Sequence, residues 1–191
     1  MSVGSISDRL GVGWAPTPLA AAARALSWAN IDAGDRVIEL GCGDGRVAIA
    51  ASKLGAAAHC VDLDPERVAA ARTSAKTAGA SLTFEVGDVY DADLRNFSAA
   101  YFFLTPQMSA RLRPQLERLP AGARVVSRSA QILGWPCGER LDVQSDDESL
   151  LFFKWTLPVA AATAPPVTER AVVDHQLECA ADDAVRRTDE L

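Results

Sequence analysis

The sequence predicts an α/β fold in which a doubly wound, Rossmann-like sheet carries helices on both faces. Three observations support this prediction. Short apolar runs alternate with helix-like segments from Leu19 to about Leu119, a glycine-rich turn follows the first run at Leu40, and a strand-turn-strand pattern begins after Gly134. The 191 residues, 49% of them hydrophobic, are enough for one sizeable core and too few for two comfortable domains.

Apolar periodicity, and the residues that interrupt it, define the predicted elements. The apolar run at residues 99–104 is rich in aromatic residues and has the character of a central parallel strand. Pro65 suits the first turn of a helix, and Gly55 and Gly79 suit the positions that follow helix ends. Helices are expected at residues 19–29, 46–54, 65–78 and 109–119, and strands at residues 36–40, 58–61, 82–86, 99–104, 124–127, 140–143 and 150–157, the last two as an antiparallel hairpin around the acidic turn 145–148.

The C-terminal residues 164–191 differ in composition from residues 1–163, which we assign to the folded domain. The tail has seven acidic and three basic residues and follows a linker-like stretch of Ala, Thr and Pro. Val173 and Leu177 recur at helical spacing, so the tail is compatible both with a marginal amphipathic helix and with disorder.

Charge and composition exclude several classes of protein. The net charge of −6 argues against binding to nucleic acid, because a phosphate backbone is bound by clustered Lys and Arg. No apolar stretch reaches the roughly 18–20 residues of a membrane span. The first 13 residues show no signal peptide, so we expect a cytoplasmic protein. Composition does not indicate an oligomeric state.

The cysteines show no spacing that is typical of a disulfide framework or of a metal site. They form no C-x-x-C pair, and we expect them to be free thiols in a reducing compartment. His175 lies four residues before a cysteine, but no second pair completes a metal site, so no metal is expected. The four cysteines are Cys42, Cys60, Cys137 and Cys179.

The strongest chemical signal is the loop from Glu39 to Gly45. Its glycines permit backbone torsions that side chains forbid and allow the main chain to approach a ligand closely. The spacing Gly-x-Gly-x-Gly differs from the Gly-x-Gly-x-x-Gly of dinucleotide-binding folds. The acids Glu39 and Asp44 would repel a pyrophosphate but suit the cationic amino and sulfonium groups of S-adenosylmethionine.

Acidic residues also follow the next two predicted strands. A carboxylate at the end of a strand, about twenty residues past the glycines, can accept hydrogen bonds from both ribose hydroxyls, and Asp62 is the better candidate. Asp64 is expected to cap the helix that Pro65 opens. Asp88 could accept a bond from an adenine amino group. Each acid alone is explained by a cap or a solvated loop, but three acids after three successive strands indicate a cofactor site.

These segments resemble the first three motifs of class I S-adenosylmethionine-dependent methyltransferases. More specifically, the chain resembles the protein-lysine methyltransferase group that includes the ATP synthase c-subunit methyltransferase and its archaeal and bacterial relatives. The resemblance covers roughly residues 14–158. The residues that carry it are Ala15-Pro16-Thr17-Pro18, Gly41-Cys42-Gly43-Asp44-Gly45-Arg46, Leu104-Thr105-Pro106-Gln107-Met108 and Pro120-Ala121-Gly122-Ala123-Arg124-Val125-Val126-Ser127.

The resemblance implies a seven-stranded sheet, mostly parallel with the last strand antiparallel. It also implies that Thr17 lies near the methionine end of the cofactor and that the loop after the fourth strand borders the acceptor nitrogen. The predicted catalytic residues are Leu104, Thr105 and Pro106. The predicted cofactor-binding residues are Thr17, Glu39, Gly41, Cys42, Gly43, Asp62, Leu63, Asp88 and Val89.

Methyl transfer from a sulfonium needs positioning and no covalent intermediate. An acceptor lysine must first lose its proton, which a dry channel favours because burial lowers the pKa of an ammonium group. Backbone carbonyls, such as those of Leu104 and Thr105, could then aim the nitrogen lone pair. Candidates for the channel walls are Tyr101, Phe102, Phe103 and Trp135. Core packing explains each of them at least as well, and explains Phe102 better.

The leading hypothesis is therefore an enzyme that uses S-adenosylmethionine to methylate a lysine on a protein partner. An enzyme of the same fold acting on a small molecule is the nearest alternative, because fold does not choose the acceptor. A non-enzymatic cofactor-binding or interaction module is a second alternative. A nicotinamide dehydrogenase fits the glycine spacing least well.

Overall fold

The computed structural model describes residues 15–145, 148–160 and 165–188. Trp14 and the acidic pair Asp146 and Asp147 lie outside these ranges. The helices are α2 (Leu19–Trp28), α3 (Arg46–Lys53), α4 (Pro65–Ala78), α5 (Pro106–Leu116) and α6 (Glu169–Thr188). The strands are β1 (Arg36–Leu40), β2 (Ala57–Asp62), β3 (Leu82–Val86), β4 (Ala99–Phe102), β5 (Arg124–Arg128), β6 (Glu139–Ser145) and β7 (Glu148–Thr156).

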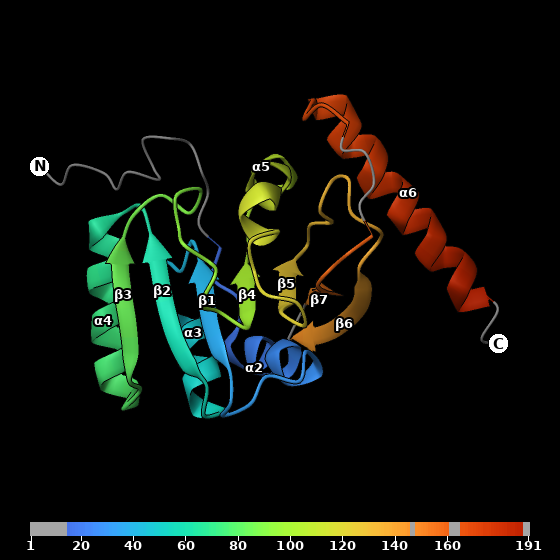
Figure 1. Cartoon of the computed structure of the whole chain (residues 1–191). Coiled ribbons are helices and arrows are strands. Elements are labelled where there is room, and N and C mark those ends of the chain that lie inside the picture. Colours follow the sequence, from blue (N-terminus) through green and yellow to red (C-terminus); the bar gives the residue numbers. More distant parts are fainter. Residues whose placement is uncertain (1–14, 146–147, 161–164, 189–191) are drawn as a thin grey trace, which may run out of the picture.

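The strands form one seven-stranded sheet in the order β3-β2-β1-β4-β5-β7-β6, which confirms the predicted sheet (Figure 1). The pairs from β3 to β5 are all parallel. Strand β7 is antiparallel to both of its neighbours, β5 and β6, so it is the single reversed strand of the sheet. The chain order reverses between β1 and β4, which creates the crevice where such folds bind ligands.

Helices cover both faces of the sheet, and each face has its own apolar core. Helices α2 and α3 pack on one face, where they bury Leu26 and Val47 against strand residues such as Val37. On the other face α5 buries Leu112 and Leu116. Phe102, the last residue of β4, is fully buried in this second core.

Capping side chains fix where the helices at the carboxyl edge of the sheet begin. Asp64 accepts a hydrogen bond from the Glu66 backbone N–H at the start of α4, as predicted. Thr105 likewise accepts from the Met108 N–H and caps α5. The predicted start of α5 at residue 109 was therefore three residues too late, because the cap at Thr105 and the proline after it begin the helix earlier.

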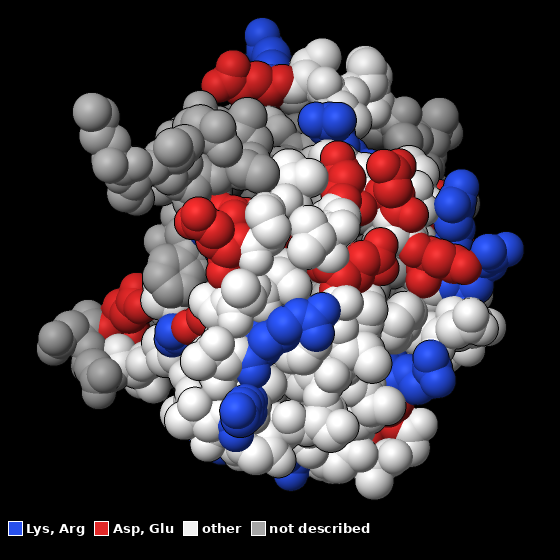
Figure 2. All heavy atoms as spheres, turned by 90° about the vertical axis from the view of Figure 1, so that its left-hand side faces the viewer, with Lys and Arg blue, Asp and Glu red and all other residues white. Residues whose placement is uncertain are grey.

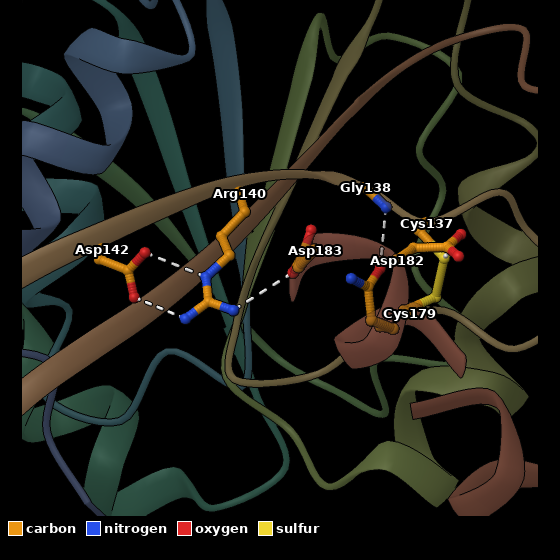
Figure 3. A network of polar contacts seen from close by, with 8 residues as sticks. Cys137, Gly138, Arg140, Asp142, Cys179, Asp182 and Asp183 are labelled. Carbon is orange, nitrogen blue, oxygen red and sulfur yellow. Dashed lines mark hydrogen bonds and ion pairs between the residues drawn. A yellow bond between two sulfur atoms is a disulfide. The ribbon is translucent and has the colours of Figure 1, made fainter. Parts of the chain in front are cut away.

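The prediction of four free thiols was wrong for two of the cysteines. Cys137, in the segment before β6, and Cys179, in α6, form a disulfide across 42 positions of sequence (Figure 3). Only Cys42 and Cys60 are free thiols, and both are buried. The bond could not be predicted from the spacing of the cysteines, because the two residues are distant in sequence and only folding brings them together.

The tail forms the helix α6, which lies beside α5 at the end of the molecule nearest β6 (Figure 1). Its apolar attachment is small and consists of Val172 packed with Ala110 and Leu133. Gln176 of α6 exchanges two hydrogen bonds with the backbone of Gln131, each 2.9 Å long. The ion pair of Arg140 with Asp183 adds a polar contact (Figure 3).

Among the described residues, no helix has the length and apolarity that crossing a membrane requires.

Candidate active site

A cavity of about 700 Å³ opens at the carboxyl edge of the sheet, beside the point where β1 and β4 diverge. That volume lies in the range typical of sites for small molecules and cofactors. The strap that precedes α2 (residues 15–17), the glycine loop, and the segments after β2, β3 and β4 form its walls. All twelve of the predicted site residues except Gly43 border this cavity.

The glycine loop is built by hydrogen bonds that it makes with the end of β2. The N–H groups of Gly41 and Cys42 both donate to the carbonyl of Val61, at 2.8 and 3.0 Å. Gly45 has φ +76°, and a Cβ there would lie 3.0 Å from the Cβ of Ala71 in α4. Glycine is therefore required at position 45 both by the backbone torsion and by the approach of α4.

Asp62 joins the loop to the cavity. One carboxylate oxygen accepts from the Gly43 N–H at 2.8 Å, and the other accepts from the Asp64 N–H at 3.0 Å. Each carboxylate oxygen has a second lone-pair position, so the same group can also accept from ligand hydroxyls. Gly43 thus belongs to the site through Asp62, which explains why it does not border the cavity.

Glu39 is a buried acid at the floor of the cavity. Its Oε2 accepts from the Ala48 N–H at 2.7 Å, and the residue is 4% exposed. Burial, and to a smaller extent the neighbouring acids Asp44 and Asp62, raise the pKa of Glu39 to about 8 despite the hydrogen bond from Ala48. A cationic ligand group would favour the ionised form of this carboxyl.

Asp44 differs from its predicted role as a second acid for the cationic groups. Its carboxylate makes a two-pronged ion pair with Arg46, with an Nη2 to Oδ2 distance of 2.5 Å. Arg46 neutralises this acid and also reaches the Thr17 carbonyl at 3.5 Å. Glu39 is therefore the acid beside the glycine loop that can face a cation, once it has released its proton.

The Cys42 thiol borders the cavity but has no sign of a nucleophile. A hydrogen bond with Cys60 and burial raise the pKa of the Cys42 thiol. Because the thiolate is the reactive form of a cysteine, the raised pKa makes Cys42 a structural part of the loop and a poor nucleophile.

One end of the cavity suits a planar base. Leu63 and Val89 are apolar, and Arg111 lies over the Tyr90 ring at 4.5 Å. Asp88 accepts from the Tyr90 N–H at 2.9 Å, which turns the chain after β3. Its carboxylate has further lone pairs that can accept from an exocyclic amino group.

The other end of the cavity lies between the strap and the β4–α5 loop. The Thr17 and Tyr101 hydroxyls are 2.9 Å apart, and both residues border the cavity with Phe103. Burial raises the pKa of Tyr101, so its hydroxyl stays protonated. Of the other channel candidates, Phe102 and Trp135 belong to the core of the opposite face and do not border the cavity.

The carbonyl of Thr105 is already engaged within α5. It accepts from both the N–H and the hydroxyl of Ser109, each at 2.9 Å. Leu104 thus supplies the better candidate carbonyl for an acceptor, and Pro106 forms part of the wall.

Several residues of the site were missed by sequence reasoning. Tyr90, Arg111 and Ser129 border the cavity, and Ser129 has the positive φ of 67° that few residues other than glycine adopt. Arg128 lies directly behind the cavity wall. An arginine directly after the buried run Val125-Val126-Ser127 was the available signal.

The donor set fits S-adenosylmethionine. The cavity offers apolar walls for a base, the Asp62 carboxylate for ribose hydroxyls, and Glu39 for an amino cation. The Arg46 guanidinium borders the same charged end and suits a carboxylate.

Comparison with known proteins agrees with this chemistry. A family model described as the ANTKMT methyltransferase domain matches residues 39–139. The chain belongs to this family. It is a methyltransferase, and S-adenosylmethionine is its cofactor.

Relatives of this methyltransferase differ in length and in named acceptor. The protein-lysine N-methyltransferase of Saccharolobus islandicus is 32% identical over 138 residues, which cover 70% of this chain and 86% of the relative. The mouse ATP synthase c-subunit lysine N-methyltransferase is 36% identical over 94 residues, 48% of this chain and 38% of that protein.

Solved structures share the methyltransferase fold. A crystal structure described as an RNA methyltransferase from Salinibacter ruber with S-adenosyl-L-homocysteine has a TM-score of 0.68 and 33% identity, and covers 75% of this chain and 94% of its own. The ribosomal protein L11 methylase of Lactobacillus delbrueckii, at a TM-score of 0.59 and 19% identity, shares the fold.

Cofactor binding near pH 7 is expected to release a proton from Glu39. At pH values between 4.5, the ordinary pKa of this carboxyl, and about 8, its raised pKa, Glu39 keeps its proton in the folded protein without ligand and loses it in the unfolded chain. The folded state thus binds more protons than the unfolded state, and this carboxyl makes folding less favourable as the pH rises through that window. Calorimetry in two buffers of different ionisation enthalpy measures the release. Glu39→Gln should abolish it, and a variant that releases as much as the wild type would refute the assignment.

Proposed function

We propose that this methyltransferase N-methylates a lysine side chain on a protein. The observation that carries the proposal is the 32% identity to a protein-lysine N-methyltransferase, which extends over 86% of that relative. The cavity supports it, because the part of its wall formed by Phe103, Leu104 and Pro106 suits an uncharged amine.

We propose that the predicted residues divide the work along the cavity. The end with Leu63, Asp88 and Val89 takes the base, Asp62 takes the ribose, and the end with Glu39 takes the amino acid part. Gly41 and Cys42 form the floor, and Gly43 holds Asp62 in place.

The bound cofactor supplies an electrophilic methyl group. The residues of this chain orient the acceptor and exclude water from it. Apolar walls disfavour an ammonium ion in the cavity and so favour the neutral amine. We propose that the Leu104 carbonyl accepts a hydrogen bond from the amine N–H and thereby orients its lone pair.

RNA is the second candidate acceptor, because the similar Salinibacter ruber structure is described as an RNA methyltransferase. The charge of this chain opposes it. The net charge is −6, and acidic side chains gather on the upper part of the face in Figure 2, toward the end where the cavity opens. A polyanion would be repelled there, whereas a lysine-bearing partner would be attracted.

Radiolabelled S-adenosylmethionine, incubated with the enzyme and a host lysate, tests the acceptor. We expect label in protein bands that resist ribonuclease and disappear when lysines are reductively methylated beforehand. Persisting bands after lysine blocking would reject lysine. Label lost to ribonuclease would favour RNA, and label only in small molecules would favour a small-molecule acceptor. An Asp62→Ala variant is the control, because it should label nothing.

The proposed location is the cytoplasm. Although the Cys137–Cys179 disulfide is more typical of an oxidising compartment, the sequence has no disulfide framework, and Cys42 and Cys60 are free thiols, as is usual in a reducing compartment. In such a compartment the Cys137–Cys179 pair would exist largely as thiols. The attachment of α6 would then depend on its non-covalent contacts.

A further inference from the structure

Arg128, at the end of β5, is buried behind the wall of the cavity. Only 6% of the residue is exposed. A buried guanidinium is costly unless its donors are satisfied, so the partners of Arg128 indicate what it does.

Its directed hydrogen bonds go to the strap. One nitrogen, Nη1, donates to the Pro16 carbonyl at 3.2 Å and to the Thr17 hydroxyl at 3.4 Å. The guanidinium also stacks on the Phe103 ring at 4.2 Å. The ion pair with Glu148 is long, at 3.7 Å, and that acid is largely exposed, so solvent screens it.

The strap depends on few other attachments in the described structure. Ala15 and Pro16 are exposed, while Thr17 is 4% exposed. Thr17 is held by the Tyr101 hydroxyl and, at 3.5 Å, by Arg46. Helix α2 begins after Pro18 without a side-chain cap.

The strap borders the charged end of the cavity, where Glu39 and Arg46 lie. Leu63, Val89 and Tyr90 form the apolar end. Glu39 and Arg46 at the charged end are complementary to the amino and carboxylate groups of an amino acid. We therefore expect a movement of the strap to alter binding of the amino acid part of a ligand and to leave binding of the base unchanged.

We propose that Arg128 is a positioning residue that holds residues 15–17 against the amino acid end of the cavity, and so sets affinity for the methionine part of the cofactor. It reaches the strap across more than a hundred positions of sequence and does not itself border the cavity. The proposal rests on the cofactor assignment and is independent of the methyl acceptor.

Two ligands separate this role from a purely structural one. S-adenosylhomocysteine carries the amino acid part, whereas 5′-methylthioadenosine lacks it. In Arg128→Met, S-adenosylhomocysteine should bind about 10- to 100-fold more weakly, as expected for loss of charged hydrogen bonds, while 5′-methylthioadenosine changes less than about twofold. Titration calorimetry measures both affinities, and a melting curve reports folding.

Arg124→Met is the matched control. Arg124 is at the opposite end of β5, where its guanidinium pairs with the buried Asp35. This variant should lower the melting temperature and leave the ratio of the two affinities unchanged. An Arg128→Met variant that weakens both ligands equally, or neither, would overturn the proposal.

Arg128→Lys keeps the charge and provides the test if Arg128→Met fails to fold. Lysine lacks the planar guanidinium that stacks on Phe103 and places Nη1 beside Pro16 and Thr17. Arg128→Lys and Thr17→Val both break the hydrogen bond between Arg128 and the Thr17 hydroxyl. Their effects on S-adenosylhomocysteine binding should therefore be non-additive. Additive effects, or no effect of Arg128→Lys, would refute the role.

Discussion

Asp62→Ala is expected to weaken S-adenosylmethionine binding by more than about 100-fold. The carboxylate accepts from the N–H groups of Gly43 and Asp64 and presents its remaining lone pairs to the cavity. The substitution leaves two buried donors unpaired and removes the acceptor proposed for the ribose. Each hydrogen bond to a charged group contributes about 1.5–3 kcal/mol. Losing the two bonds proposed to the ribose hydroxyls therefore weakens binding by more than about 100-fold.

Asp62→Asn and Asp64→Asn sharpen this test, with affinity measured by calorimetry. Asparagine has one oxygen, so at position 62 it can satisfy only one of the two backbone donors, and an intermediate loss is expected. At position 64 asparagine still caps α4 and should change the affinity less than about threefold. Equal losses at the two positions would mean that negative charge alone, and not the contacts of Asp62, determines binding.

Reduction of the disulfide is expected to release α6 from the rest of the molecule. We propose that residues 164–191 are appended to the domain of residues 1–163, because the described side chains of α6 attach it through the disulfide, a small apolar cluster and a few polar contacts. The bond joins Cys137 and Cys179 across 42 positions, and the chain-entropy model gives about 4 kcal/mol for closing a loop of that length. Hydrogen exchange in α6 should accelerate by up to about 1,000-fold in Cys137→Ser/Cys179→Ser.

The wild-type protein treated with a thiol reductant should behave like the double serine variant. Amides in β1 and β4 should keep their protection, and the affinity for S-adenosylmethionine should not change, because α6 does not border the cavity. Arg140→Gln, which removes the ion pair with Asp183 in α6 and a local ion pair with Asp142 but keeps the disulfide, is the control and should accelerate exchange less than about fivefold. Unchanged exchange in the double variant would show that non-covalent contacts suffice.

The parallel part of the sheet was predictable because its signals are local. Residues 36–40, 65–78 and 82–86 form the expected elements with the expected bounds. The strand ends bring Glu39 and Asp62 to one cavity, as the alternation of strands and helices required. Apolar periodicity, glycine and proline carry this information within a few residues of each element.

The rest depended on contacts between distant segments. The partner of Cys137 lies in α6, and the partners of Arg128 lie in the strap, so neither could be inferred from spacing. The Asp44–Arg46 pair is local, but its geometry depends on how the glycine loop turns. The engaged carbonyl of Thr105 follows from an early helix start that periodicity did not reveal.

The position of β7 has a consequence for synthesis of the protein. Although β6 precedes it in the chain, β7 lies between β6 and β5, so β5 has no partner on its outer side until residues 148–156 exist. A nascent chain halted before that point would present the open edge of β5 and an unattached β6 to its surroundings. Such an edge can pair with other chains and seed aggregation. Translation of β7 is thus the step that covers the open edge of β5 and joins β6 to the sheet.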